Sequence, residues 1–344
     1  MRIPLDVDEL TPQWFSEVLD VDVRSVEVID QHSGTTGRAK VRIDSAGELP
    51  DTLFCKLAPF DSKQRAFLTF TGIGVMEARF YAALGAELPV RAPHCRYADV
   101  DGDSFIMVLE DLDAAGCSYR SDPRSTIEEL ARLHAAFWES PRFATDLSWV
   151  PDRAGFGKSD GKDPAAASAA GHFIRVALDR FAHEMPPVFR AVGELYAERT
   201  ADILDLWDQG ERTFIHGDPH AGNLFTHDGR TGFYDWAMCS HSPGMRDVAY
   251  HLTNSVPTDT RRAIEGDLLD HYRHTLAGQG VTLDATLTAN QYRLFTVFSW
   301  VSFTSTAAVG SRWQPADKAI EAMERATRAV EDCDSIGLLE ELLG

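Results

Sequence analysis

Positive charge is scarce in this 344-residue sequence. It has 33 Lys and Arg against 53 Asp and Glu, which gives a formal net charge of −20 at pH 7. Such an excess of negative charge repels the phosphate backbone of nucleic acids and the surface of anionic membranes over the Debye length. We therefore expect neither nucleic acid nor a membrane among the partners of the protein.

Cysteine is also scarce, and the long apolar runs of secreted or membrane proteins are missing. The five cysteines are scattered and form no C-x-x-C pair that would indicate zinc or a redox centre. The N-terminal segment carries acids where a secretion signal needs a basic start and an apolar run. The most apolar stretch, residues 292–309, is interrupted by Arg293 and by several Ser and Thr, which favours a buried helix over a membrane span. These absences predict a cytoplasmic protein with reduced thiols.

The length and composition predict a folded chain with two lobes. Hydrophobic residues make up 44% and charged residues 25% of the chain, which is typical of a globular protein, and the length exceeds that of a usual single core. The first part alternates β-branched runs with turn residues, which predicts three antiparallel strands, one helix and two further strands. The expected segments are residues 23–31, 39–44, 52–58, 75–85, 94–100 and 104–112.

After Leu112 the pattern changes to long helices. Apolar residues recur at helical spacing in residues 125–140, 171–185 and 189–207, whereas residues 154–171 are small and polar and predict a mobile surface loop. The fold class is therefore α+β. A five-stranded antiparallel sheet with one main helix is expected in residues 1–111, and a mostly helical part in residues 112–344.

The most informative motif is HGDPHAGN, in which His216, Asp218 and Asn223 have the spacing H-x-D-x-x-x-x-N. This spacing matches the catalytic loop of kinases. An Asp at the head of the loop can accept the proton of an attacking hydroxyl, and the later Asn can offer its carbonyl oxygen to Mg²⁺ on the phosphates. The motif predicts Asp218 as the catalytic base and Asn223 as a metal ligand.

A second metal ligand is predicted at Asp235, which follows the strand-like segment TGFY. The interval from Asp218 has room for one hairpin, built around Asp228 and Gly229, that would bring this carboxylate back beside the loop. Mg²⁺ prefers hard oxygen ligands and usually takes one or two of them from the protein. Asn223 and Asp235 meet that requirement.

Upstream segments predict a site for the phosphates of a nucleotide. In HSGTTGR the residues Ser33, Gly34 and Gly37 can form a loop whose glycines allow close approach and positive φ. Lys56 lies in a short apolar strand and needs a partner, which Glu77 on the following helix can supply. Taken singly, these residues more often indicate a hairpin turn, an edge-strand charge and a solvated helix face. Their order along the chain favours the phosphate site.

This order of parts resembles the phosphotransferase superfamily that includes aminoglycoside phosphotransferases, choline kinases and ecdysteroid-kinase-like proteins. HGDPHAGNLF is similar to the catalytic loop of that superfamily, and FYDWAMCS is similar to its metal-binding Asp-Trp motif. LARLHAAFW and MVLEDL are similar to segments that it carries between the lobes. The resemblance spans residues 26–252 and implies a bilobal protein-kinase-like fold, with Mg²⁺ and with ATP or GTP as the phosphoryl donor.

The resemblance also implies roles for residues that the spacing alone leaves open. The stretch from Glu110 to Leu112 would be a hinge whose backbone binds the adenine edge. His216 would support the catalytic loop, and Asp247 would cap it from the next helix. The resemblance gives Asp218, Asn223, Asp235, Lys56 and Glu77 the roles already described.

The acceptor is predicted to be a small molecule. Protein kinases have a long activation segment that ends in A-P-E, but the interval from Asp235 to Asp247 is short and no A-P-E occurs. Aromatic residues of the C-terminal part could line a pocket for a lipophilic alcohol, and acids could receive an amino sugar or a quaternary amine. The more ordinary interpretation is that the aromatic residues form helix core and the acids form a solvated helix face. The aromatic set is Trp236, Tyr292, Phe295, Phe298, Trp300, Phe303 and Trp313, and the acidic set is Asp202, Asp205, Glu265 and Asp267.

The predicted function is therefore an alcohol phosphotransferase, and a lipophilic acceptor is favoured. An aminoglycoside or choline-like phosphotransferase is the alternative within this class. A nucleotide-binding pseudokinase that regulates a partner, and an enzyme that transfers a nucleotidyl group, are the alternatives from other classes.

Overall fold

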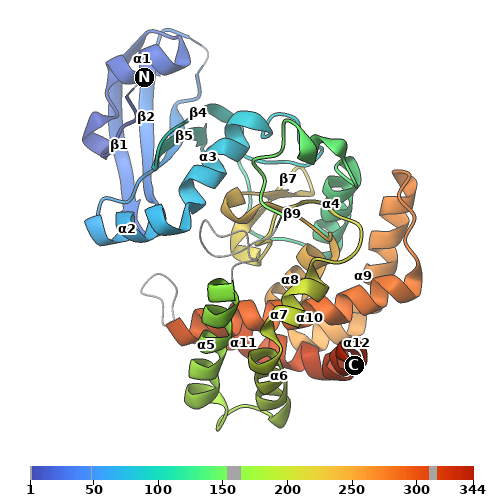
Figure 1. Cartoon of the computed structure of the whole chain (residues 1–344). Helices are drawn as coiled ribbons and strands as arrows, with labels where there is room; N and C mark the ends of the chain where they lie inside the picture. Colours follow the sequence, from blue (N-terminus) through green and yellow to red (C-terminus); the bar gives the residue numbers. More distant parts are fainter. Residues whose placement is uncertain (1, 48, 153–163, 310–315) are drawn as a thin grey trace. The chain divides into compact units, whose positions relative to one another are not determined.

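A computed structural model describes residues 2–47, 49–152, 164–309 and 316–344 (Figure 1). The described residues form two compact units. Unit 1 contains the described residues up to 119 together with Phe225–Cys239, and unit 2 contains those of 120–224 and 240–344. The chain therefore returns to unit 1 late in the sequence. A functional boundary at residues 111 and 112 stays a prediction.

Unit 1 is built on a five-stranded antiparallel sheet with the strand order β1-β2-β3-β5-β4. This confirms the predicted sheet. Helix α3 is the predicted helix, and Asp228 and Gly229 have the positive φ angles of the predicted hairpin turn between β7 and β8. The elements are η1 (Val7–Glu9), α1 (Pro12–Leu19), β1 (Val23–Ser33), β2 (Gly37–Ser45), β3 (Thr52–Leu57), α2 (Ser62–Thr71), α3 (Ile73–Ala83), β4 (Cys95–Asp101), β5 (Ser104–Glu110), β7 (Leu224–His227), β8 (Arg230–Phe233) and η4 (Trp236–Met238).

Alternating burial in β2 shows which face of the sheet packs against the core. In β2 the side chains of Ala39, Val41 and Ile43 are buried and their neighbours are more exposed, so every second residue faces the core. Helix α1 covers this face with Phe15, which is fully buried in the same cluster. The pattern fixes the register of the sheet, and with it the position of each side chain of β3.

Unit 2 is mostly helical, as predicted. Its two-stranded sheet joins β6 to β9, and the long helix α10 packs against α5, α8 and α11. Helices α5 and α6 lie side by side (Figure 1). The elements are α4 (Pro123–Ala136), η2 (Pro141–Ala144), α5 (Pro164–Phe181), α6 (Pro187–Glu198), α7 (Thr200–Trp207), β6 (Thr213–Ile215), η3 (Ala221–Asn223), β9 (Ser240–Ser242), α8 (Met245–Ser255), α9 (Thr258–Gly278), α10 (Ala285–Val309), α11 (Ala316–Asp332) and α12 (Ser335–Leu343).

The predicted loop over residues 154–171 is wrong in its second half. Residues 164–171 belong to α5, while residues 154–163 lie outside the described residues. The segment begins with a proline and is rich in alanine. Proline is well suited to the first position of a helix, and alanine has the highest helix propensity, so small residues here favour helix over loop.

None of the helices among the described residues is long and apolar enough to cross a membrane. The stretch that the sequence predicts to be a buried helix is part of α10.

Candidate active site

Lys56 lies in β3, the central strand of the sheet, and its side chain is buried. Its ammonium group forms an ion pair with Glu77 on α3, whose carboxylate is fully buried. The sequence predicts this pair, and it is present. A cation buried without a partner would be costly, so the pair holds the ammonium in one position.

Asp235 completes this cluster from a distant segment. Its Oδ1 lies 3.3 Å from Nζ of Lys56, although 179 positions separate the two residues, and its Oδ2 lies 3.9 Å from Arg38. Asp235 has a left-handed backbone with φ 62 at the start of η4. The next residue, Trp236, is fully buried and stacks on Phe80 of α3 with the ring centroids 4.4 Å apart. This anchor fixes Asp235 beside Lys56, and its carboxylate stays partly exposed.

Burial and charge act against each other on this cluster. Burial alone would lower the pKa of Lys56, but the charges of Asp235 and Glu77 outweigh it and raise the pKa, so Lys56 stays protonated. Burial raises the pKa of Glu77 to about 7, against the opposing effect of Lys56. Two carboxylates thus compete for one ammonium, and a second cation at Asp235 would relieve that competition.

The glycine-containing loop between β1 and β2 is shorter than predicted. Ser33 pairs with Gly37, and the amide of Gly34 donates to Thr36 O at 3.0 Å. Neither Gly34 nor Gly37 has a positive φ, so this part of the prediction is wrong, while a close approach of the loop to phosphates stays a prediction. A Cβ on Gly37 would lie 2.5 Å from the carbonyl oxygen of Ala58, whereas one on Gly34 would meet nothing closer than 3.5 Å. Close packing within the unit requires Gly37.

Ser33 has partners within unit 1. Its hydroxyl donates to Gln64 Oε1 at 2.9 Å and accepts the amide of Phe60 at 3.1 Å. The side chain therefore ties the end of β1 to the segment that leads into α2. A contact of Ser33 with nucleotide stays a prediction.

The predicted hinge follows β5. The carboxylate of Glu110 accepts two hydrogen bonds from Arg91 and one from the amide of His94, and Arg91 outweighs the effect of burial and lowers the pKa of Glu110. The carbonyl of Leu112 accepts the amide of Cys117 at 3.0 Å. The amide of Leu112 donates no hydrogen bond within the described chain, so it is available to a ligand.

The predicted catalytic loop lies in unit 2 and is organised by Asp247 on α8. The amides of His216 and Gly217 both donate to its carboxylate, at 2.7 and 2.8 Å. Gly217 has φ 85, a conformation that favours glycine, and it turns the chain so that both amides reach the same carboxylate. Burial alone would raise the pKa of Asp247, but His134 and these partners outweigh it and lower the pKa. Asp247 therefore caps the loop as an anion.

Asp218 and Asn223 face each other within the loop. The side-chain amide of Asn223 donates to the backbone oxygen and to Oδ2 of Asp218, both at 3.0 Å. Because its nitrogen is used in this way, the amide oxygen of Asn223 points away from Asp218. The ring of His216 accepts the amide of Asp218 at 3.2 Å and so supports the turn.

Three further residues contact the loop, and no pattern in the sequence indicates this role for them. His134 is fully buried on α4, and its Nε2 lies 3.4 Å from Asp247. Tyr250 on α8 has a pKa that burial raises well above its usual range, and the charge of Asp218 and a hydrogen bond to it raise the pKa further. His251 donates from Nδ1 to the carbonyl of Pro219 at 3.0 Å. The motif LARLHAAFW contains His134, but nothing in it indicates which residue His134 contacts.

Arg246 on α8 is a buried cation without an anionic partner. Its side chain stacks on Phe298 of α10 with Cζ 3.8 Å from the ring centroid, and the residue is 6% exposed. No carboxylate among the described residues pairs with it, and its buried Nε meets no acceptor there. A cation–π contact contributes about 0.5–2 kcal/mol, whereas burying a cation costs several kcal/mol. Burial accordingly lowers the pKa of Arg246 to about 10.

Most of the aromatic residues predicted to receive the acceptor are instead part of the hydrophobic core. Trp300 and Phe295 are core residues of unit 2, while Trp236 belongs to unit 1 and Trp313 lies outside the described residues. Helix core is therefore the better interpretation of most of the aromatic set. Phe298 stays partly exposed.

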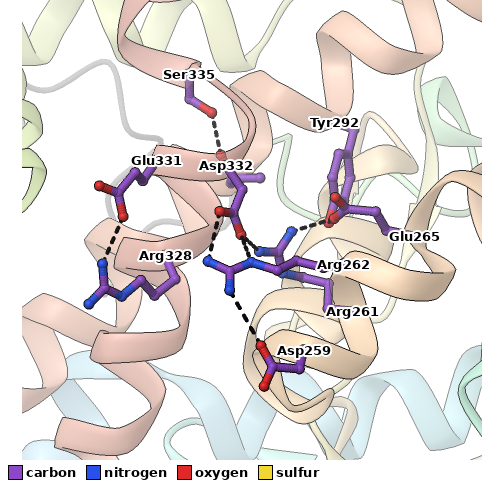
Figure 2. Close-up of polar contacts among 10 residues, drawn as sticks. Asp259, Arg261, Arg262, Glu265, Tyr292, Arg328, Glu331, Asp332 and Ser335 are labelled. Carbon is purple, nitrogen blue, oxygen red and sulfur yellow. Dashed lines mark hydrogen bonds and ion pairs between the residues drawn. The ribbon is translucent and has the colours of Figure 1, made fainter.

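Glu265 belongs to a polar cluster that joins three helices (Figure 2). Its carboxylate accepts hydrogen bonds from Arg261 on the same helix and from Tyr292 on α10, the latter at 2.9 Å. Arg261 also donates to Asp332 of α11. Because Glu265 is held inside this cluster, it is a poor candidate for an amine of the acceptor. Asp202, Asp205 and Asp267 lie on exposed positions.

Sequence and structure comparisons place the chain among known phosphotransferases. The model of the phosphotransferase enzyme family matches residues 32–282. The chain belongs to this family. It is therefore a small-molecule phosphotransferase with an alcohol group as acceptor, and its fold is protein-kinase-like. No curated protein sequence matches it.

Solved structures of low sequence identity share this fold. The GDP complex of an aminoglycoside 2′-phosphotransferase is 14% identical with a TM-score of 0.53, and the match covers 92% of this chain and 96% of that one. Choline kinase from Streptococcus pneumoniae is 15% identical with a TM-score of 0.50, covering 94% and 99%. Choline kinase from Cryptosporidium parvum is 12% identical with a TM-score of 0.52, covering 94% of each chain.

Each unit thus brings together one set of the predicted site residues. Unit 1 brings together Lys56, Glu77 and Asp235, and unit 2 brings together His216, Asp218, Asn223 and Asp247. The carboxylate of Asp235 and the amide oxygen of Asn223 are the hard oxygen donors that suit Mg²⁺. Among the described residues no group of three His, Cys, Asp or Glu could hold a metal ion.

Proposed function

We propose that the protein transfers the γ-phosphoryl group of Mg-ATP or Mg-GTP to a hydroxyl of a small alcohol, with Asp218 as the catalytic base. The contact between Lys56 and Asp235 carries this proposal. Phosphoryl transfer depends on positioning and on charge neutralisation, and a buried, ion-paired ammonium next to an exposed carboxylate supplies both.

We assign nucleotide binding to unit 1. Lys56 would meet the α- and β-phosphates, Asp235 would bind Mg²⁺, and the free amide of Leu112 would bind the adenine edge. Mg²⁺, when bound, would neutralise charge on the phosphates. The side chain of Glu110 is committed to Arg91, so any role of that residue at the adenine edge would fall to its backbone.

We assign removal of the hydroxyl proton to unit 2. Asp218 would accept the proton of the attacking hydroxyl while Asn223 holds its carboxylate, and the amide oxygen of Asn223 would serve as a metal ligand. Asp247 and His216 would keep the loop in place. We favour a lipophilic acceptor because the aromatic Phe298 stays partly exposed near Tyr250, and an aminoglycoside or choline-like amino alcohol is the alternative.

Asp218→Ala tests the base. We expect turnover to fall by about 10² to 10⁴, because a positioned base contributes that much, while Mg-nucleotide binding is kept. The measurement is ADP formation with a panel of alcohols, sterols, amino sugars and amines. Normal turnover by this variant would disprove the assignment. Mg-nucleotide binding without transfer to any acceptor by the unmodified protein would instead favour a pseudokinase.

Asp235→Ala tests the metal ligand. We expect the gain in nucleotide affinity that Mg²⁺ provides to disappear, because the carboxylate that would bind the metal is removed. Calorimetric titration of nucleotide with and without Mg²⁺ measures this gain. An unchanged effect of Mg²⁺ on affinity would rule out the role of Asp235.

A further inference from the structure

Arg246 lies on α8 one helical turn before Tyr250, whose side chain interacts with Asp218. Arg246 and Tyr250 are four positions apart on α8 and so share one face of the helix. Tyr250 hydrogen-bonds to Asp218, and its ring centroid is 4.8 Å from that of Phe303 and 6.5 Å from that of Phe298. We call Arg246, Tyr250, Phe298 and Phe303 the Arg246 patch.

The acids near Arg246 already have partners. Asp247 is held by two amides of the catalytic loop and by His134. Asp208, whose charge acts on Arg246, is paired with Arg212 at 3.2 Å. The positive charge of Arg246 therefore has no dedicated counter-ion within the described chain.

We propose that the Arg246 patch binds the acceptor, and that Arg246 pairs with an anionic group on it. This inference rests on the proposed function and names its substrate class: an alcohol with an apolar body and an acidic group several bonds from the reacting hydroxyl. A guanidinium group recognises carboxylate or phosphate oxygens through paired N–H donors.

Binding of small acids tests this proposal directly. The probes are 3-phenylpropionate, its neutral amide 3-phenylpropionamide, and 2-phenylethyl phosphate, titrated against the full chain by calorimetry or ligand-observed NMR. We expect the acid to bind about tenfold or more tightly than the amide, because only the acid forms a charge-assisted hydrogen bond. Comparison of the carboxylate with the phosphate shows which acid the site prefers.

Arg246→Gln should weaken binding of the acid by roughly 10- to 100-fold and leave the amide unchanged. Arg325→Gln is the matched control, because Arg325 is in unit 2 but already has a carboxylate partner in Glu321. It should leave both affinities unchanged. Arg246→Lys keeps the charge and should keep part of the preference, even if the glutamine variant folds poorly.

The inference is overturned if the unmodified protein does not distinguish the acid from the amide, whether both bind or neither does. It is also overturned if Arg246→Gln keeps the preference. A different result would refute the proposed function. A preserved acid preference without ADP formation from any alcohol would refute phosphoryl transfer and leave the anion site standing.

Discussion

Asp247 shows how one buried carboxylate can organise a catalytic loop. Two successive amides of the loop, those of His216 and Gly217, donate to it, and His134 approaches from α4. Moving the loop would break both amide contacts at once and leave a buried charge without partners, which is strongly unfavourable. The position of Asp218 therefore depends on a residue that takes no proton.

His251 should make the stability of the protein depend on pH. Burial lowers its pKa to about 4 from an ordinary 6.5, so between these values the unfolded chain binds more protons than the native one. Stability is therefore lost as the pH falls from 6.5 towards 4, by about 2 kcal/mol at pH 5. Chemical denaturation at pH 7 and pH 5 measures this loss.

His251→Asn is the control for this effect. Its side-chain amide can still donate to Pro219 O but does not titrate, so the variant should lose about 2 kcal/mol less than the parent protein between pH 7 and pH 5. Equal losses in both proteins would assign the acid sensitivity to other groups.

The sequence predicts local residue patterns better than distant contacts. The spacing of His216, Asp218 and Asn223 is readable because these residues meet within one loop. Arg246 could not be recognised, since its lack of a partner depends on which side chains the helices bring near it. The reason for Gly37 was also hidden, because the carbonyl of Ala58 approaches it only after the strands have paired.

At the scale of elements, two neighbouring arginines of α9 should contribute unequally to the stability of the contact between α9 and α11. Arg261 and Arg262 both donate to Asp332 of α11, but the side chain of Arg261 is 1% exposed and that of Arg262 is 45% exposed (Figure 2). Burial alone would raise the pKa of Asp332, but the two guanidinium groups outweigh it and lower the pKa. The buried arginine joins α9 to α11, and the exposed one adds to a contact that already exists.

We expect Arg261→Met to lower the free energy of unfolding by about 1.5–3 kcal/mol, because it removes a buried guanidinium that hydrogen-bonds two carboxylates, although Asp332 keeps Arg262 and Glu265 keeps Tyr292 as partners. Arg262→Met should lower the free energy of unfolding much less, because solvent screens an exposed pair. Urea denaturation of both variants measures the difference. Similar losses would mean that burial does not decide the strength of these contacts.

Most elements could be predicted from the sequence, and the exceptions have local causes. Buried and more exposed residues alternate in β2, and β5 is a continuous run of buried apolar residues; both patterns indicate strands. The start of α5 was mistaken for a loop because alanine-rich sequence lacks an apolar stripe. Residues 189–207 carry one helical pattern, yet the structure has two helices, α6 and α7, separated at Arg199, where the backbone leaves helical geometry with φ −115.

At the scale of the whole molecule, the segment Phe225–Cys239 belongs with residues far earlier in the chain. Trp236 stacks on Phe80, and the amide of Phe233 donates to Arg91 O at 2.8 Å. No sequence pattern indicates this return, because the contacts join positions more than a hundred residues apart. The family resemblance supplied the roles of the segment but not its partners.

Phe80→Ala tests whether this segment is stable only with unit 1. Removing a fully buried ring typically costs about 3–5 kcal/mol. We expect hydrogen exchange to quicken in both the β3 region and residues 225–239, while α8 in unit 2 keeps its protection. Faster exchange in α8 to the same extent would show that the two units unfold together.

The late return of the chain to unit 1 also limits where the protein can be truncated or joined to a relative in a chimaera. A fragment that ends near residue 119 would contain Lys56 and Glu77 but lack Asp235 and the indole that covers Phe80. Exchange of nucleotide-binding halves between relatives would meet the same difficulty, because a crossover at one point leaves Asp235 behind with the other parent. Functional chimaeras should therefore need two junctions, one on each side of residues 225–239.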